Sequence, residues 1–102
     1  RFIYIDYVNM HDESIYNYVT YSGWEEDKNS IYQFIRVSMY THQQNEVIQT
    51  LINKYIDAGY DHHIDENDKH WLTKDYGDSS KMHISLHLGL GKVIFEARIK
   101  DR

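Results

Sequence analysis

The sequence predicts an α+β fold, an antiparallel sheet of four to five strands with one principal helix packed on one of its faces. Two observations carry this prediction. Residues 41–59 repeat apolar side chains at the spacing of a helix, whereas residues 82–99 alternate apolar and polar side chains around a glycine turn, as in a β-hairpin. The 102 residues contain no proline and no linker-like or repeated segment, so we expect a single domain over residues 1–102.

The first 40 residues are predicted to be mostly extended. Residues 2–8 alternate and are rich in β-branched and aromatic side chains, which is typical of a strand. Residues 15–21 fit either a short helix capped by Asp12 or a strand, and their tyrosines, valine and threonine favour the strand. The glycine and charges of residues 23–30 indicate a turn. Residues 31–40, IYQFIRVSMY, give the strongest strand prediction.

The helix is predicted over about residues 42–58. Thr41 and Gln44 have the spacing of a capping box, and Gly59 follows the helix where a left-handed C-cap belongs. We expect the apolar stripe of the helix to cover one sheet face. The stripe consists of Val47, Ile48, Leu51, Ile52, Tyr55 and Ile56.

The C-terminal hairpin, residues 82–99, has the same predicted register for a two-residue and a four-residue turn. One face is then wholly apolar and pairs Leu88 with Val93, Leu86 with Phe95, Ile84 with Ala97, and Met82 with Ile99. The other face carries His87 beside Ile94, Ser85 beside Glu96, and His83 beside Arg98. We interpret this polar face as the solvated side of a half-buried hairpin.

Acidic charge is concentrated in one segment. The net charge is −5, and residues 57–78, with seven acidic and two basic side chains, account for all of it. A short strand is predicted inside this segment, at residues 70–73. An acidic segment in a chain with ten tyrosines favours binding to a protein partner, in particular a basic one. The predicted binding residues are Asp61, Asp65, Glu66, Asp68, Trp71 and Tyr76.

These features predict a small acidic, tyrosine-rich protein-interaction module, similar in general character to small inhibitors and immunity proteins. No basic face is apparent that would neutralise the phosphates of duplex nucleic acid. No apolar run approaches the roughly 18 residues of a membrane span. The absence of cysteine favours a cytoplasmic compartment. A basic C-terminal end opposes the acidic segment, which favours a charged partner or a homo-oligomer.

The alternative function is a small enzyme or ligand-binding domain that uses the polar hairpin face, with His83, Ser85, His87, Glu96 and Arg98 as its site. In an enzyme, the two histidines, Glu96 and Arg98 would be the catalytic residues. No complete catalytic motif or phosphate-binding glycine loop is present, so the sequence favours a binding role without a cofactor.

No metal site is expected. The alternative is a site built from His62, His63 and His70, since imidazoles are common ligands of zinc and nickel. Adjacent histidines on an extended backbone do not easily face one ion, which argues against this alternative.

Overall fold

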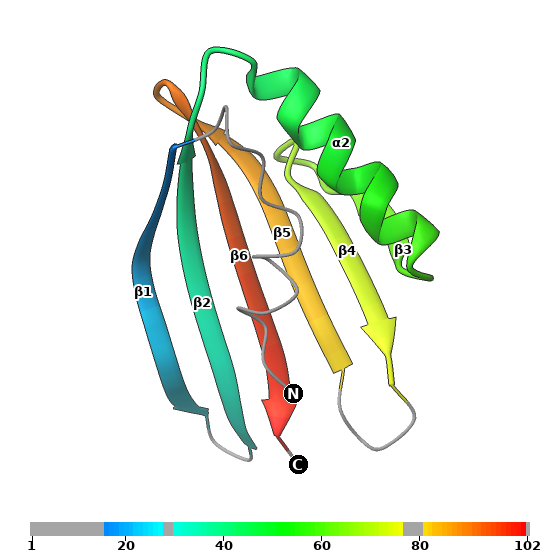
Figure 1. The fold of residues 1–102 in the computed structure, drawn as a ribbon. Coiled ribbons are helices and arrows are strands. Elements are labelled where there is room, and N and C mark those ends of the chain that lie inside the picture. The colour runs from blue at the N-terminus through cyan, green and yellow to red at the C-terminus, as the bar shows by residue number, and fades with distance from the viewer. Residues whose placement is uncertain (1–15, 28–29, 77–80, 102) are drawn as a thin grey trace.

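The computed structural model describes residues 16–27, 30–76 and 81–101, and the strand predicted over residues 2–8 lies outside them. The elements in chain order are β1 (Tyr16–Asp27), β2 (Ser30–Tyr40), α2 (Gln44–Asp57), β3 (Asp61–Ile64), β4 (His70–Asp75), β5 (Lys81–Gly89) and β6 (Lys92–Asp101). The strands form one antiparallel sheet in the order β1-β2-β6-β5-β4-β3, and α2 crosses in front of it in Figure 1. The predicted α+β class is confirmed, but the described strands number six instead of four or five.

Two segments are more extended than the sequence predicts. The strand interpretation of residues 15–21 is confirmed from Tyr16 onward, but β1 does not end at Gly23. It stays paired with β2 until Asp27 lies opposite Ser30, so the turn predicted from residue 23 is wrong. Strand β3 was not predicted, because all four of its residues are exposed and lack an apolar alternation.

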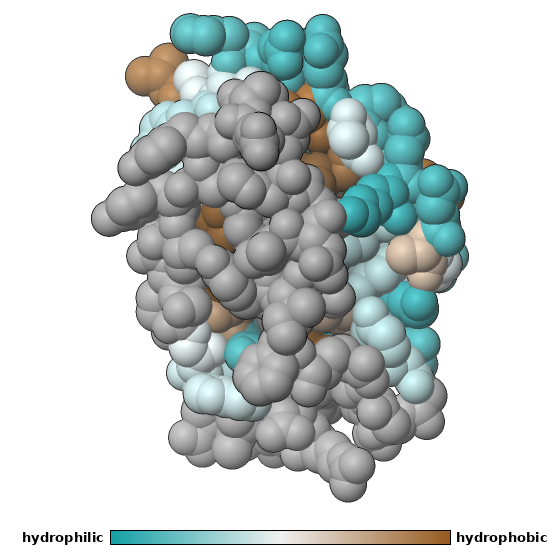
Figure 2. All heavy atoms as spheres, in the orientation of Figure 1, coloured by the Kyte–Doolittle hydropathy of each residue, from teal (hydrophilic) through white to brown (hydrophobic). Residues whose placement is uncertain are grey.

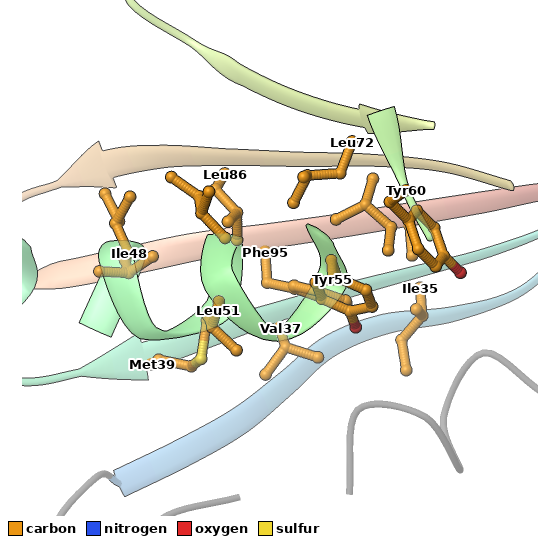
Figure 3. Close-up of a cluster of buried hydrophobic side chains, with 14 of the residues drawn as sticks. Ile35, Val37, Met39, Ile48, Leu51, Tyr55, Tyr60, Leu72, Leu86 and Phe95 are labelled. Atoms are coloured by element: carbon orange, nitrogen blue, oxygen red, sulfur yellow. The ribbon is translucent and has the colours of Figure 1, made fainter. Parts of the chain in front are cut away.

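The hydrophobic core lies between α2 and one face of the sheet (Figure 3). From the helix it contains Val47, Ile48, Leu51, Ile52 and Tyr55. From the sheet it includes Ile35, Val37, Met39, Leu72, Leu86 and Phe95. All four apolar pairs predicted for the hairpin are confirmed. The outward side of α2 is largely hydrophilic in Figure 2.

The prediction that Ile56 belongs to the buried stripe of the helix is wrong, because its side chain is 45% exposed. At ~100° per residue, it lies roughly 110° from the middle of the arc that the five buried helix residues occupy. The buried arc is therefore narrower than the sequence suggests. Within the described part of the chain, no helix has the length and hydrophobicity to cross a bilayer.

The predicted capping box at the start of α2 is wrong. The N-cap is Gln43, whose backbone N–H donates to Thr41 Oγ1 at 3.0 Å. The side-chain amide of Gln44 donates instead to the carbonyl oxygens of Gly89 and Lys92, both at 2.8 Å. Gln44 therefore links the start of the helix to the turn between β5 and β6.

The predicted glycine cap at the end of α2 is confirmed. Gly59 has a φ of +94°, in the region that favours glycine. Its N–H donates to the Ile56 carbonyl at 2.9 Å, and the N–H of Tyr60 donates to the Tyr55 carbonyl at 2.9 Å. These two bonds make a Schellman motif, and the rings of Tyr55 and Tyr60 pack edge to face with centroids 4.9 Å apart.

Candidate functional site

The sheet face opposite α2, here called the outer face, carries two adjacent rows of directly paired residues. The first row runs from β4 to β2 through Thr73, His83, Arg98 and Phe34. The second row runs through Trp71, Ser85, Glu96 and Arg36. Directly paired residues have Cβ atoms only about 4.5–5.5 Å apart, so the register alone brings these side chains together. The three pairs predicted for the polar face of the hairpin are confirmed, and two of them, Ser85 with Glu96 and His83 with Arg98, belong to these rows.

A pocket of about 310 Å³ lies over the two rows. Its lining consists of Phe34, Lys69, Trp71, His83, Ser85, Glu96, Ala97 and Arg98. Ser85 lies between Trp71 and Glu96 in its row, and between His83 and His87 along β5. A small side chain among large ones leaves a depression, and Ser85, only 3% exposed, lies at its base.

Trp71 is held in place by the turn between β3 and β4. Its indole Nε1 donates to Asp65 Oδ2 at 2.8 Å. The other oxygen of Asp65 accepts the backbone N–H groups of Asn67 at 2.8 Å and Lys69 at 3.0 Å. These hydrogen bonds, the one from Trp71 foremost, lower the pKa of the Asp65 carboxyl. The carboxylate therefore builds the turn and fixes the ring that lines the pocket.

Among the described residues that line the pocket, Glu96 is the one carboxylate. Arg36 binds its Oε2 through Nη2 at 3.0 Å and donates to it through Nε at 3.1 Å. Lys69 Nζ lies 3.9 Å from its Oε1. Two cations therefore compensate the negative charge of Glu96.

Arg98 differs from Arg36, although both guanidinium groups lie over aromatic rings. The Arg98 group is 4.5 Å from the ring centroid of Tyr32 and 5.6 Å from that of Phe34. Among the residues that the structure describes, Arg98 has no ion pair, whereas Arg36 is paired with Glu96. Arg98 is thus an exposed cation at the edge of the pocket, supported by rings and not by a carboxylate.

His83 is a neutral hydrogen-bonding group in this site. Burial lowers its pKa, and the positive charges of Lys81 and Arg98 lower it further. At pH 7 the imidazole can therefore donate through one nitrogen and accept through the other. Within the described residues it makes no hydrogen bond to the neighbouring Ser85.

His87 belongs to the same polar strand face but does not line the pocket. Burial lowers its pKa, and the charges of Lys69 and Arg36 act in the same direction against the opposing effect of Glu96. Its Nδ1 is buried and makes no hydrogen bond to the described part of the chain. The structure therefore brings His83, Ser85, Glu96 and Arg98 of the alternative site together in the pocket lining, and places His87 beside Ser85 on the same face but outside the lining.

The six residues predicted to bind a protein do not share one surface. Trp71 lies on the outer face, whereas Tyr76 packs against the core, with its hydroxyl 2.8 Å from that of Tyr60. Asp65 is engaged in the turn and with the indole. The three remaining carboxylates, exposed along β3 and its turn, are Asp61, Glu66 and Asp68.

The three histidines of the alternative metal site do not converge. Neighbouring residues of a strand face opposite sides, so His62 lies on the helix side and His63 on the outer face beside Trp71. His62 Nε2 is 3.0 Å from His70 Nδ1, a hydrogen bond between two imidazoles. No group of three histidine, cysteine or acidic side chains suited to a metal occurs among the described residues.

Sequence reasoning missed Phe34 and Lys69 as part of the pocket. In β2, Phe34 lies on the side opposite Ile35, Val37 and Met39, where polar residues are expected, so an aromatic residue at this position is a signal in the sequence. Lys69 precedes Trp71 by two residues, at the end of the turn, and its role depends on the unpredicted β3–β4 hairpin. Neither residue type shows from the sequence alone that β2 pairs with β6 or that β4 pairs with β5.

Comparisons with known proteins supply no family for this chain. No family model, no curated protein and no solved structure matches it. The chemistry of the pocket residues therefore has to carry the functional inference.

Proposed function

We propose that this chain is a ligand-binding domain whose site is the outer-face pocket. The supporting observation is that one hollow is lined by three polar side chains that make no side-chain hydrogen bond or ion pair to the described residues, Ser85, His83 and Arg98. Ligand sites are typically concave and apolar, with a few polar groups that fix the orientation of the ligand. A volume of about 310 Å³ is at the lower end of the usual range of such sites and suits a small molecule.

The geometry favours binding over nucleophilic catalysis. A serine nucleophile needs a base within hydrogen-bonding distance, and Ser85 has no such bond to His83 or His87 in the described part of the chain. The carboxylate that could orient a histidine, Glu96, is bound to Arg36 instead. These groups can recognise a ligand but do not form a catalytic dyad.

The proposal is tested by mapping small molecules onto the 15N-labelled protein by NMR. A chemically diverse fragment library should contain compounds that shift the amides of the pocket residues and the indole N–H of Trp71. Trp24, the second tryptophan, lies outside the pocket lining and is an internal reference. A library that leaves the pocket signals unchanged would contradict the proposal.

Two variants with the same new side chain distinguish pocket binding from general surface binding. Ser85→Leu fills the base of the pocket, whereas Thr73→Leu adds the same group on the outer face outside the lining. Ligands should lose affinity for the first and keep it for the second. Trp71→Ala, which removes a lining ring, replaces Ser85→Leu if the latter does not give a dispersed NMR spectrum.

A second proposal, a protein-interaction module that binds a basic partner, is supported by the edge of the sheet at β3. β3 is at the edge of the sheet that the described strands form, and all four of its residues are exposed. Exposed carboxylates lie on it and on the adjoining turn, at Asp61, Glu66 and Asp68. An extended basic peptide could add to this edge by main-chain pairing.

The test of the second proposal leaves Asp65 intact, because this residue builds the turn. The triple variant Asp61→Asn/Glu66→Gln/Asp68→Asn should lose a host protein that the wild type retains by affinity capture at low salt. Asn suits position 68, where φ is +61°. Equal capture by both proteins would contradict the acidic-edge proposal.

A further inference from the structure

We infer that the ligand of the outer-face pocket is a small aromatic anion, a flat ring that carries a carboxylate or phosphate group. This inference rests on the proposed function and adds the chemical class of the ligand. It follows from the charge of the lining, the arrangement of its hydrogen-bonding groups, and the two aromatic side chains that border the hollow.

The lining has the opposite charge to the chain. The whole chain carries −5, yet in the described lining the two cations Lys69 and Arg98 outnumber the one carboxylate, Glu96. Glu96 also forms an ion pair with a third cation, Arg36, which lies opposite it on β2 in the same row. Among the residues that the structure describes, the charge left uncompensated at the pocket is therefore positive, at Arg98. A ligand that supplies an anionic group would complete the site.

The free groups around Arg98 are suited to an oxyanion. A guanidinium offers a planar fork of N–H donors that matches a carboxylate or a phosphate. His83 pairs directly with Arg98, and Ser85 is its diagonal neighbour on the same face. Diagonal neighbours are about 7–8 Å apart at their Cα atoms. The Arg98 guanidinium rests over the Tyr32 ring, 4.5 Å from its centroid, and a turn of this side chain toward Ser85 would let one oxyanion bond to the guanidinium and the hydroxyl.

The remainder of the hollow is suited to a flat ring. Trp71 and Phe34 lie in the lining, and the Trp71 indole N–H is already donated to Asp65. Trp71 therefore has a fixed orientation, so it loses little conformational entropy when a ligand stacks on it. Lys69 Nζ lies over its ring, 5.0 Å from the centroid, so a stacking ligand has to displace this ammonium group. Phe34 is only 6% exposed, and the guanidinium groups of Arg36 and Arg98 lie over its ring, so it forms a fixed part of the lining and not an open ring face.

The experiment compares ligands that share a benzene ring and differ in charge. Phenyl phosphate and benzoate are the anionic probes, benzamide is the neutral one and benzamidine the cationic one. Inorganic phosphate supplies the anion without a ring. Titrations followed by the pocket amides and the two indole N–H signals give a dissociation constant and a location for each probe. We expect the ring anions to bind at least about tenfold more tightly than benzamide, benzamidine or phosphate.

Arg98→Gln and Lys92→Gln form a matched pair of variants. Both residues lie on the same face of β6, both rest over aromatic rings, and each substitution removes one positive charge. Lys92 lies outside the pocket lining. Arg98→Gln should weaken the binding of phenyl phosphate about tenfold or more, because it removes a charge-assisted bond. Lys92→Gln should change it by less than about twofold, since it only alters the surrounding field.

The possible outcomes separate this inference from the proposed function. Benzamide or benzamidine binding in the pocket as tightly as the anions would overturn the inference and leave the ligand-binding domain standing. Equal losses in the two variants would also overturn it, because they would indicate general charge attraction. If neither the probes nor the fragment library shifted the pocket signals, both the inference and the proposed function would fail.

Discussion

The carboxylate of Asp65 accepts the indole N–H of Trp71 at 2.8 Å, so a residue in a turn determines the orientation of a ring in the pocket. The same carboxylate accepts two backbone N–H groups of the turn, from Asn67 and Lys69. An acidic residue that composition assigns to an interaction surface therefore acts inside the molecule. One carboxylate oxygen accepts the hydrogen bonds of the turn and the other accepts the indole N–H, so a substitution can remove the second bond and keep the first set.

Asp65→Asn should leave the turn intact and release Trp71. The remaining amide oxygen can still accept the two backbone N–H groups, whereas the new NH₂ group cannot accept an indole N–H. We expect a folded protein with a large shift of the Trp71 indole signal and weaker ligand binding. Asp65→Ala should lower the urea midpoint further, since it removes both sets of bonds. Glu66→Gln, a neighbouring charge loss, is the control, and an identical response in it would refute this division of roles.

Gln44→Ala should destabilise the protein by about 1–2 kcal/mol, because two hydrogen bonds between the helix start and the hairpin are lost. Gln49→Ala removes the same amide from the same helix, where its one side-chain bond to a described residue is to Asn53 on the exposed side. This control should cost less than about 0.5 kcal/mol. Urea unfolding of both variants measures the difference, and equal losses would show that the link from Gln44 to the hairpin does not stabilise the fold.

Replacement by aspartate should greatly lower the stability of the protein at Leu51 and change it little at Ile56. Leu51 is 5% exposed against the sheet, so Leu51→Ala should cost about 2–4 kcal/mol and Leu51→Asp should unfold the protein. Ile56→Asp should change stability by no more than about 0.5 kcal/mol, because its side chain already faces solvent. Circular dichroism melts provide the measurement. A native-like Leu51→Asp variant would contradict the packing of α2 on the sheet.

Gly59→Ala should destabilise by about 1–2 kcal/mol through the backbone alone. A Cβ at this position would meet Lys74 Nζ at 3.5 Å, which is an ordinary contact, so the cost comes from the positive φ. Gly59→Asn should cost less, since asparagine tolerates this conformation better than alanine. Chemical denaturation of the two variants decides the matter, and alanine as stable as asparagine would argue against a conformational origin.

Stability should fall as the pH drops below about 6.5, the ordinary pKa of histidine. The folded protein lowers the pKa of His62, His83 and His87, chiefly through burial. Between the lowered values and the ordinary one, the unfolded chain binds more protons than the folded chain, so protonation favours unfolding. The stability is fully present above about pH 6.5 and declines as the pH falls toward the lowered values.

Urea unfolding at pH 7.5, 6.5 and 5.5 tests this dependence. The double variant His83→Gln/His87→Gln should have a flatter profile than the wild type, because two of the three responsible groups are gone. A wild-type protein that is equally stable at all three pH values, or more stable at pH 5.5, would contradict the assignment.

The predictable part of the fold is the part with local periodicity. The stripe of α2 and the register of the β5–β6 hairpin follow from residues close together in the sequence, and both are confirmed apart from Ile56. Strand β3 has no buried side, and β1 continues through Gly23 because β2 pairs with it. Elements held mainly by their neighbours leave little signal in their own sequence.

The candidate site was half predictable for the same reason. His83, Ser85, Glu96 and Arg98 belong to one hairpin, so their alternation brings them together on one face. Trp71 and Phe34 reach the site from strands on either side of that hairpin. Sheet order is a non-local property, and the alternation within a single strand does not specify it.

The position of β6 has a consequence for how this protein folds. It is the last described element in the chain, yet it lies in the interior of the sheet between β2 and β5. Before β6 is available, β1–β2 and β3–β4–β5 are two separate half-sheets, each with an unpaired edge. Joining them brings together residues far apart in the sequence, such as Arg36 and Glu96, which are 60 positions apart. This late closure has a high entropic cost, so we expect slow folding on the scale of domains of this size, with aggregation competing until the two half-sheets unite.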